Sequence, residues 1–249
     1  MTEKQERLLQ LLGEFARICR ENDLKYVTAE KTALGVMQRG GFLPGDDTVT
    51  VYMPAEDWHK LMNLAGTVLE ANRTLLCLES DSSFGSVGAA YASTDRCALR
   101  RHQIMGNGCA GERIDVFLLD PVSADKEEYE KYCADLMLYA DLADPGQVYG
   151  DRWEISGAAY KRGLLSCQVT GKDRVLKKLE ENLQVHETEE CPRYAVRSGE
   201  VPFLLEKDML FPAKEKDFQG IPVMVPGHIT LAYFDQKSTV DYIGVVQGI

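Results

Sequence analysis

Positive charge is scarce in this chain. Its 28 Lys and Arg residues are outnumbered by 39 Asp and Glu residues, which gives a formal net charge of −11 at pH 7. Proteins that bind nucleic acid use a basic stripe to displace counterions from phosphates, so this balance argues against nucleic acid as a partner. It also argues weakly against docking on anionic lipid. A solvated acidic surface is the simplest interpretation.

Paired cysteines, signal sequences and long apolar runs are missing too. The seven cysteines are scattered and form no Cys-x-x-Cys pair, so we expect reduced thiols and neither a zinc site nor a disulfide framework. The charged stretch Met1–Arg7 opens into a helical pattern without the apolar core of a signal peptide. No window approaches the roughly 20 apolar residues of a membrane span. The sequence therefore predicts a cytoplasmic protein without a transmembrane segment.

Common catalytic motifs are also absent. The segment Gly106–Gly111 is rich in glycine but lacks the Gly-Lys-Ser/Thr ending of a P-loop. No Gly-x-Ser-x-Gly elbow of a serine hydrolase occurs. His59, His186 and His228 show no metal-ligand spacing. The candidate chemistry therefore depends on carboxylates.

Helical and strand patterns alternate along the chain. We predict one α/β unit, with a mixed-sheet core in residues 1–122 and a helical subdomain with an irregular C-terminal segment in residues 123–249. The expected helices cover residues 5–22, 125–142, 154–165 and 172–184, and one more begins at Pro54. The expected strands are Leu24–Thr28, Thr48–Tyr52, Arg73–Leu78, Val87–Ser93 and Arg113–Leu119, the last ending at Asp120-Pro121, with short extended pieces at Val201–Leu205 and Ile221–Val225.

The most informative stretch combines a turn with acids. A T-x-L-G turn at Thr32–Gly35 leads through a glycine-rich loop to Asp46 and Asp47, where an alternating strand begins. Successive side chains of a strand point to opposite faces, so Asp46, Thr48 and Thr50 are predicted to share one face. Acids gathered there would hold a divalent metal against the phosphates of a nucleotide.

Asp115 lies in the middle of an apolar strand. An acid between apolar neighbours is costly to bury unless it binds a cation or accepts hydrogen bonds. With Asp46 on a neighbouring strand end, it would form the skeleton of a metal site for phosphoryl or nucleotidyl transfer. The alternative is structural: Asp46 and Asp47 serve a turn, and Asp115 pairs with Arg113 or Arg100. Spacing alone leaves both interpretations open.

The order of these motifs resembles the LicD family of phosphotransferases, which includes the fukutin-related proteins and has a nucleotidyltransferase-like fold. The resemblance runs from the N-terminal helix through the turn, the loop and the acids to a Phe-Pro segment near the end. The matching segments are Ile18-Cys19, Thr32–Gly35, Gly41–Pro44, Asp46-Asp47, Glu56–Trp58, Ile114–Asp120, Phe211-Pro212 and Phe218–Pro226.

The resemblance implies a metal-dependent transferase. Such an enzyme moves phosphocholine or a polyol phosphate from a cytidine-diphosphate-linked donor onto a cell-surface glycan, such as lipopolysaccharide or teichoic acid. Asp46 and Asp115 would hold Mg²⁺ or Mn²⁺, and Asp47 and Asp115 would be the catalytic acids. The residues expected at the donor are Lys31, Thr32, Gly35 and Arg100.

The chain departs from the family at these chemical positions. The paired glycines that let a backbone approach phosphate are replaced by Glu30 and Lys31. The third and fourth motif acids are Thr48 and Thr50, which removes two negative charges from the metal cage. Glu30 turned inward would be a replacement ligand. Two hypotheses follow: a transferase with a degenerate site, or a catalytically silent homologue that acts as a binding or partner subunit.

Overall fold

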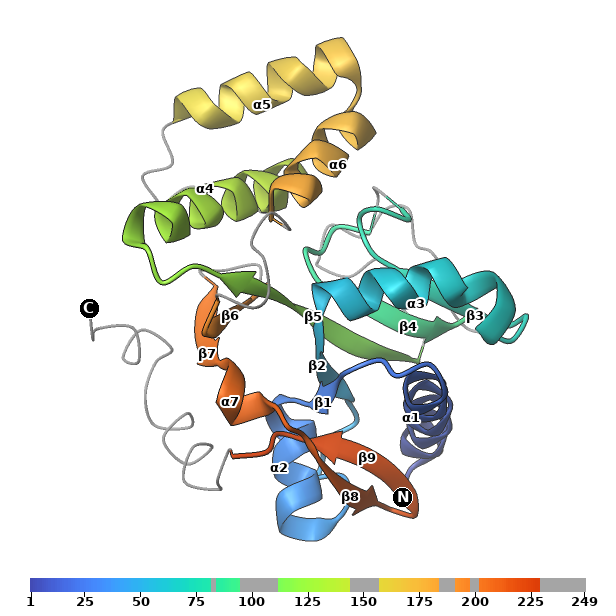
Figure 1. The fold of residues 1–249 in the computed structure, drawn as a ribbon. Coiled ribbons are helices and arrows are strands. Elements are labelled where there is room, and N and C mark those ends of the chain that lie inside the picture. Colours follow the sequence, from blue (N-terminus) through green and yellow to red (C-terminus); the bar gives the residue numbers. More distant parts are fainter. Residues whose placement is uncertain (82–83, 95–111, 144–156, 184–190, 198–201, 229–249) are drawn as a thin grey trace.

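The structure is a computed structural model, and it describes residues 1–81, 84–94, 112–143, 157–183, 191–197 and 202–228. A mixed sheet lies between helices, and a group of three helices stands at one end of the molecule (Figure 1). The predicted α/β class, with a mixed sheet and flanking helices, is confirmed.

The strands form one sheet and a separate two-stranded ribbon. Their bounds are β1 (Val27–Thr28), β2 (Thr50–Pro54), β3 (Arg73–Leu76), β4 (Ala89–Ser93), β5 (Arg113–Val122), β6 (Arg193–Val196), β7 (Phe203–Glu206), β8 (Lys214–Phe218) and β9 (Ile221–Val225). The sheet has the order β1-β2-β5-β4-β3, and β6 pairs with β5 and β7. Strands β2 and β5 run parallel, and the other pairs run antiparallel.

Helices cover both faces of the sheet. Their bounds are α1 (Glu3–Glu21), α2 (Glu30–Arg39), α3 (Ala55–Val68), α4 (Lys126–Ala143), α5 (Gly157–Thr170), α6 (Lys172–Leu183) and α7 (Lys207–Leu210). Val51 and Val116 point to the face covered by α1 and α3. Tyr52 and Leu119 belong to the core that includes residues of α2 and α7. This alternation along β2 and β5 produces a layer of helices on each side of the sheet.

Helix α1 shows how directly the sequence specifies an element. It begins at a capping box, in which Thr2 Oγ1 accepts from Gln5 N and Gln5 Oε1 accepts from Thr2 N. The apolar residues at helical spacing face the core as predicted, and those buried are Leu8, Leu11, Leu12, Phe15, Ile18 and Cys19.

Two local predictions were wrong. The expected turn at Thr32–Gly35 is part of helix α2, which ends at Gly40 in the left-handed conformation that favours glycine. Strand β5 does not stop at Asp120-Pro121 but continues to Val122. It does so because its second half pairs with β6, a strand in the tail that the sequence pattern did not reveal.

The helical group packs around its own core. Apolar residues of α4 and α6 form a cluster that reaches the sheet through Ala195 of β6. Among them are Tyr132, Leu136, Leu176 and Leu183. Among the helices of the described residues, none combines the length and the apolar character needed to cross a membrane.

A buried ion-pair network joins this helical group to the sheet. Arg197 directly follows β6 and is 1 % exposed. Its Nε and Nη2 donate to the two carboxylate oxygens of Asp120 on β5, at 2.5 and 2.8 Å. Its Nη1 donates to Glu180 of α6 at 2.8 Å, and the Tyr132 hydroxyl of α4 donates to Asp120 at 2.7 Å. Burial opposes the Arg197 charge, yet the two carboxylates outweigh it and raise the pKa of Arg197 well above its usual value.

We expect Arg197→Met to destabilise the protein by about 3–5 kcal/mol, because it leaves Asp120 buried without its counter-charge. Urea unfolding measures the change. The control is Arg17→Met, which breaks an exposed pair with Glu21 and should cost about 0–1 kcal/mol. Equal unfolding midpoints for the two variants would contradict the central role of Arg197.

Candidate functional site

The parallel pair of strands β2 and β5 carries the predicted acidic region. Thr50 of β2 is in register with Asp115 of β5, so their side chains are neighbours on one face of the sheet. Helix α2 contacts β2 here, and Thr32 Oγ1 accepts a hydrogen bond from Thr50 N at 2.9 Å. Three segments that are distant in sequence therefore meet at this point.

Asp46 is buried, and a turn uses its carboxylate. Asp46 Oδ1 accepts from Thr48 Oγ1 at 2.7 Å and from Thr48 N at 3.3 Å. This is the hydrogen bonding of an Asx turn. The Asp46 carbonyl accepts from Gln5 Nε2 at 2.7 Å. Thr48 is therefore a donor to Asp46 and adds no negative charge beside it.

The other two motif acids each face a cation. Asp47 is exposed, and its Oδ2 lies 2.7 Å from Lys4 Nζ. The hydrogen bond and the charge of Lys4 lower the pKa of Asp47 below its usual value. Asp115 Oδ1 accepts from Arg113 Nε at 2.6 Å. Asp115 thus makes the ion pair with Arg113 that the structural interpretation predicts.

Glu30 is turned toward Tyr52, whose hydroxyl donates to Glu30 Oε1 at 2.5 Å. The φ of Glu30 is +49°, in the left-handed region that costs a residue with a Cβ about 1–2 kcal/mol. Glycine adopts this region freely. The backbone at this position therefore has a conformation suited to glycine, although the residue is a glutamate.

The residues expected at the donor have separate local roles. Lys31 is exposed in the first turn of α2, whereas Thr32 is buried in its bond to Thr50. Gly35 is needed for packing, because a Cβ there would come within 2.4 Å of the Gly41 carbonyl oxygen. The fourth residue, Arg100, lies outside the described residues.

The donor set does not fit a divalent ion. Within the described ranges, no three His, Cys, Asp or Glu side chains gather closely enough to hold a metal ion. Asp46 and Asp115 keep their carboxylates, but a hydroxyl donates to one and a guanidinium to the other. Mg²⁺ and Mn²⁺ favour several oxygen ligands that together carry negative charge.

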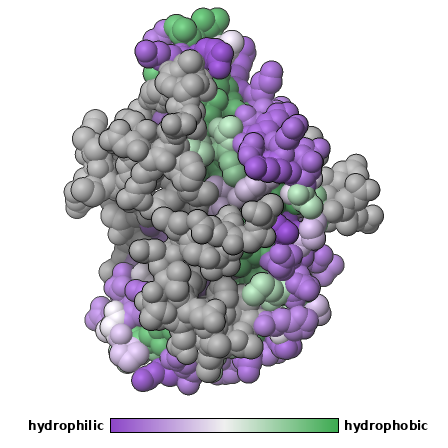
Figure 2. All heavy atoms as spheres, turned by 90° about the vertical axis from the view of Figure 1, so that its left-hand side faces the viewer, coloured by the Kyte–Doolittle hydropathy of each residue, from purple (hydrophilic) through white to green (hydrophobic). Residues whose placement is uncertain are grey.

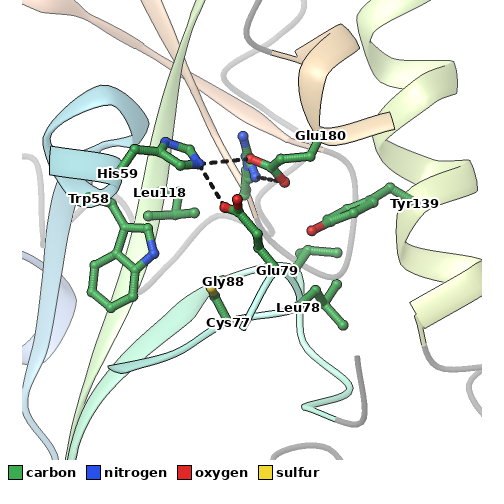
Figure 3. A pocket seen from close by; sticks show the side chains of 11 residues that line it. Trp58, His59, Cys77, Leu78, Glu79, Gly88, Leu118, Tyr139 and Glu180 are labelled. Carbon is green, nitrogen blue, oxygen red and sulfur yellow. Dashed lines mark hydrogen bonds and ion pairs between the residues drawn. The ribbon is translucent and has the colours of Figure 1, made fainter. Parts of the chain in front are cut away.

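A second group of polar residues lines a small pocket between α3, the sheet and the helical group (Figure 3). His59 Nε2 lies 3.3 Å from Glu79 Oε2 and 3.7 Å from Glu180 Oε1. The buried Trp58 Nε1–H lines the same pocket and has no hydrogen-bond acceptor among the described residues.

This pocket has room for about one water molecule, which is too little for a nucleotide. The sequence contains no spacing signal for it, because Trp58, Glu79 and Glu180 come from three separate segments. The candidate site for a nucleotide therefore stays at the strands β2 and β5.

Comparison of the chain with protein-family models, with curated proteins and with solved structures gives no match.

A double-mutant cycle should separate two contributions to the free energy of unfolding, one from the Glu30–Tyr52 hydrogen bond and one from the left-handed backbone of Glu30. Tyr52→Phe removes a hydrogen bond to a charged acceptor and should cost about 1.5–3 kcal/mol. In the Tyr52→Phe background the bond from Tyr52 is already lost, while Glu30→Gly still relieves about 1 kcal/mol of backbone strain. Glu30→Gly should therefore be less destabilising in that background than in the parent, as measured by urea unfolding.

The control pairs Glu30→Gly with Tyr26→Phe, because Tyr26 belongs to the core on the other face of the sheet. The effects of that pair should add within about 0.5 kcal/mol. Additivity of the Glu30 and Tyr52 variants would instead show that the two side chains act independently.

Proposed function

We propose that this protein is a LicD-like protein with a degenerate transferase site, and that it acts without catalysis as a binding or partner subunit in the cytoplasm. The observation that carries this proposal is the internal pairing of the site's acids. Asp46 is bound by Thr48, Asp115 by Arg113 and Glu30 by Tyr52. Each of these acids, which the resemblance implies at a metal or donor site, thus has a partner within the chain.

Electrostatics supports the same proposal. A diphosphate brings negative charge that a metal ion normally neutralises in phosphoryl transfer. Loss of one preorganised electrostatic contact typically lowers a rate by about 10²-fold or more. Here two threonines replace acids at Thr48 and Thr50, so a metal cage of the family type lacks two of its charges.

Charge restoration should recover a metal site. In Thr48→Asp/Thr50→Asp, new carboxylates lie beside Asp46 and Asp115, and their mutual repulsion favours a bound cation. We expect Mn²⁺ at about 100 times its dissociation constant to stabilise this variant by roughly 2.7 kcal/mol. Thermal unfolding with Mn²⁺ and with a chelator measures the difference.

The matched control is Thr48→Asn/Thr50→Asn, which has nearly the same shape without the charge and should show no response to Mn²⁺. The parent protein should likewise show no shift that requires Mn²⁺ together with cytidine diphosphate-choline or cytidine diphosphate-ribitol. A shift of the parent that needs both components would sink the non-catalytic proposal.

The alternative is a transferase that still uses the remaining acids. It is favoured by Asp115, whose side chain is 39 % exposed on the central strand and so is open to a ligand. The test is release of cytidine monophosphate from either donor with a glycan acceptor. We expect no release above background by the parent, and no change in Asp115→Asn. Release that Asp115→Asn abolishes would establish the transferase.

A further inference from the structure

One short segment of this acidic chain is strongly basic. Residues 157–178 contain six basic residues and one acidic residue, Asp173, so their formal charge is +5. With −11 for the whole chain and +5 here, the rest of the chain carries −16. The basic residues are Lys161, Arg162, Lys172, Arg174, Lys177 and Lys178, and all of them except Lys172 are exposed.

The same segment presents apolar side chains to solvent. On α5, Leu165 is 59 % exposed, Val169 is 83 % exposed and Leu164 is 36 % exposed. In the part of the chain that the structure describes, Met1 is the other large hydrophobic residue with such exposure. Exposed apolar residues concentrated on one element mark an interaction surface more strongly than scattered ones do.

The packing of α5 fixes which way these residues point. Gly163 faces α4 so closely that a Cβ there would lie 3.0 Å from Leu138 Cδ1 and 3.1 Å from Leu142 Cδ1. Leu165 is two positions further along the helix and thus lies on its opposite side. Lys161 precedes Leu165 by four residues and Val169 follows it by four, so these three form one outward row.

Helix α5 also lies at an extreme end of the molecule, beyond α4 and far from α1 and α2 (Figure 1). Figure 2 shows hydrophobic surface beside hydrophilic surface at this end. A broad, flat partner can therefore contact the outward row without approaching the sheet, α1 or α2. At physiological ionic strength charges are screened over about 8 Å. A surface that meets the outward row therefore responds to the basic residues of α5 and α6 and to the acids of the adjacent α4 more than to the charge of the distant sheet and helices.

We propose that the outer face of α5, together with the exposed basic residues of α6, docks on an anionic lipid bilayer. Lys and Arg attract anionic headgroups, and Leu165 and Val169 enter the boundary between headgroups and acyl chains. A nucleic acid would use the cations but not the exposed Leu and Val. The outward row lies on a single helix that protrudes at one end of the molecule. Such a protruding surface is better matched by a deformable lipid bilayer than by a protein partner. The proposal goes beyond the proposed function and does not depend on the nucleotide site.

The test is co-sedimentation of the full chain with vesicles of phosphatidylcholine alone or mixed with phosphatidylserine. We expect binding to the phosphatidylserine vesicles, no binding to pure phosphatidylcholine, and release at high salt. Lys161→Glu/Arg162→Glu should weaken binding by about tenfold or more, since each basic residue near the surface contributes about fivefold to tenfold. Leu165→Gln/Val169→Gln should weaken it as well, with less effect on the salt dependence.

The matched control is Lys214→Glu/Lys216→Glu, which makes the same charge change on the exposed residues of β8. It should bind as the parent does, and all variants should keep the parent's thermal midpoint, because the exchanged side chains are exposed. No binding by the parent, equal binding to both kinds of vesicle, or an equal loss in the control would overturn the proposal. So would a parent dimer that Leu165→Gln/Val169→Gln converts to monomers, since the face would then belong to a second copy of the chain.

Discussion

The buried network around Arg197 and Asp120 joins the sheet of this protein to its helical group. Asp120 lies on the long central strand β5, Arg197 follows the strand β6 that pairs with it, and Glu180 belongs to α6. A guanidinium removed from water is tolerated only with full compensation, and these two carboxylates provide it, while the Tyr132 hydroxyl donates to Asp120. The bidentate pair fixes the guanidinium and the Asp120 carboxylate on the sheet, and their bonds to Glu180 and Tyr132 then limit the positions that the helical group can take.

The same principle of internal compensation applies to the acids near strands β2 and β5. A cation site has carboxylates that stay incompletely compensated until the ion arrives. Here Asp46, Asp115 and Glu30 are each compensated by a hydrogen bond or ion pair within the chain. The left-handed backbone at Glu30 keeps a shape that glycine would adopt without strain. These residues thus combine a backbone conformation that suits glycine with side chains that satisfy one another.

Much of the fold could be predicted from periodicity, whereas the partners of the acids could not. The apolar spacing of α1 and the apolar run of β5 result from burial against a single core, and such burial is visible in the sequence as a periodic pattern of apolar residues. Helix α2 was missed because its Thr32–Gly35 segment contains a glycine and is soon followed by Gly40 and Gly41, residues that are typical of turns. The acids were found as candidates, but the choice of Arg113 as the partner of Asp115 depends on side-chain placement that spacing does not specify.

Strand β9 packs against α1 although about 200 residues separate them, and Val223 shares a core with Leu8 and Leu12. Tyr26, just after α1, accepts a hydrogen bond from Met224 N at 3.3 Å. At synthesis rates of about 5–20 residues per second, the part of α1 that packs on β9 stays uncovered for on the order of 10–40 s after the helix has been made. A product that ends before Ile221 can still pack α1 against β4 and β5, but it leaves the β9 side of that helix exposed to solvent.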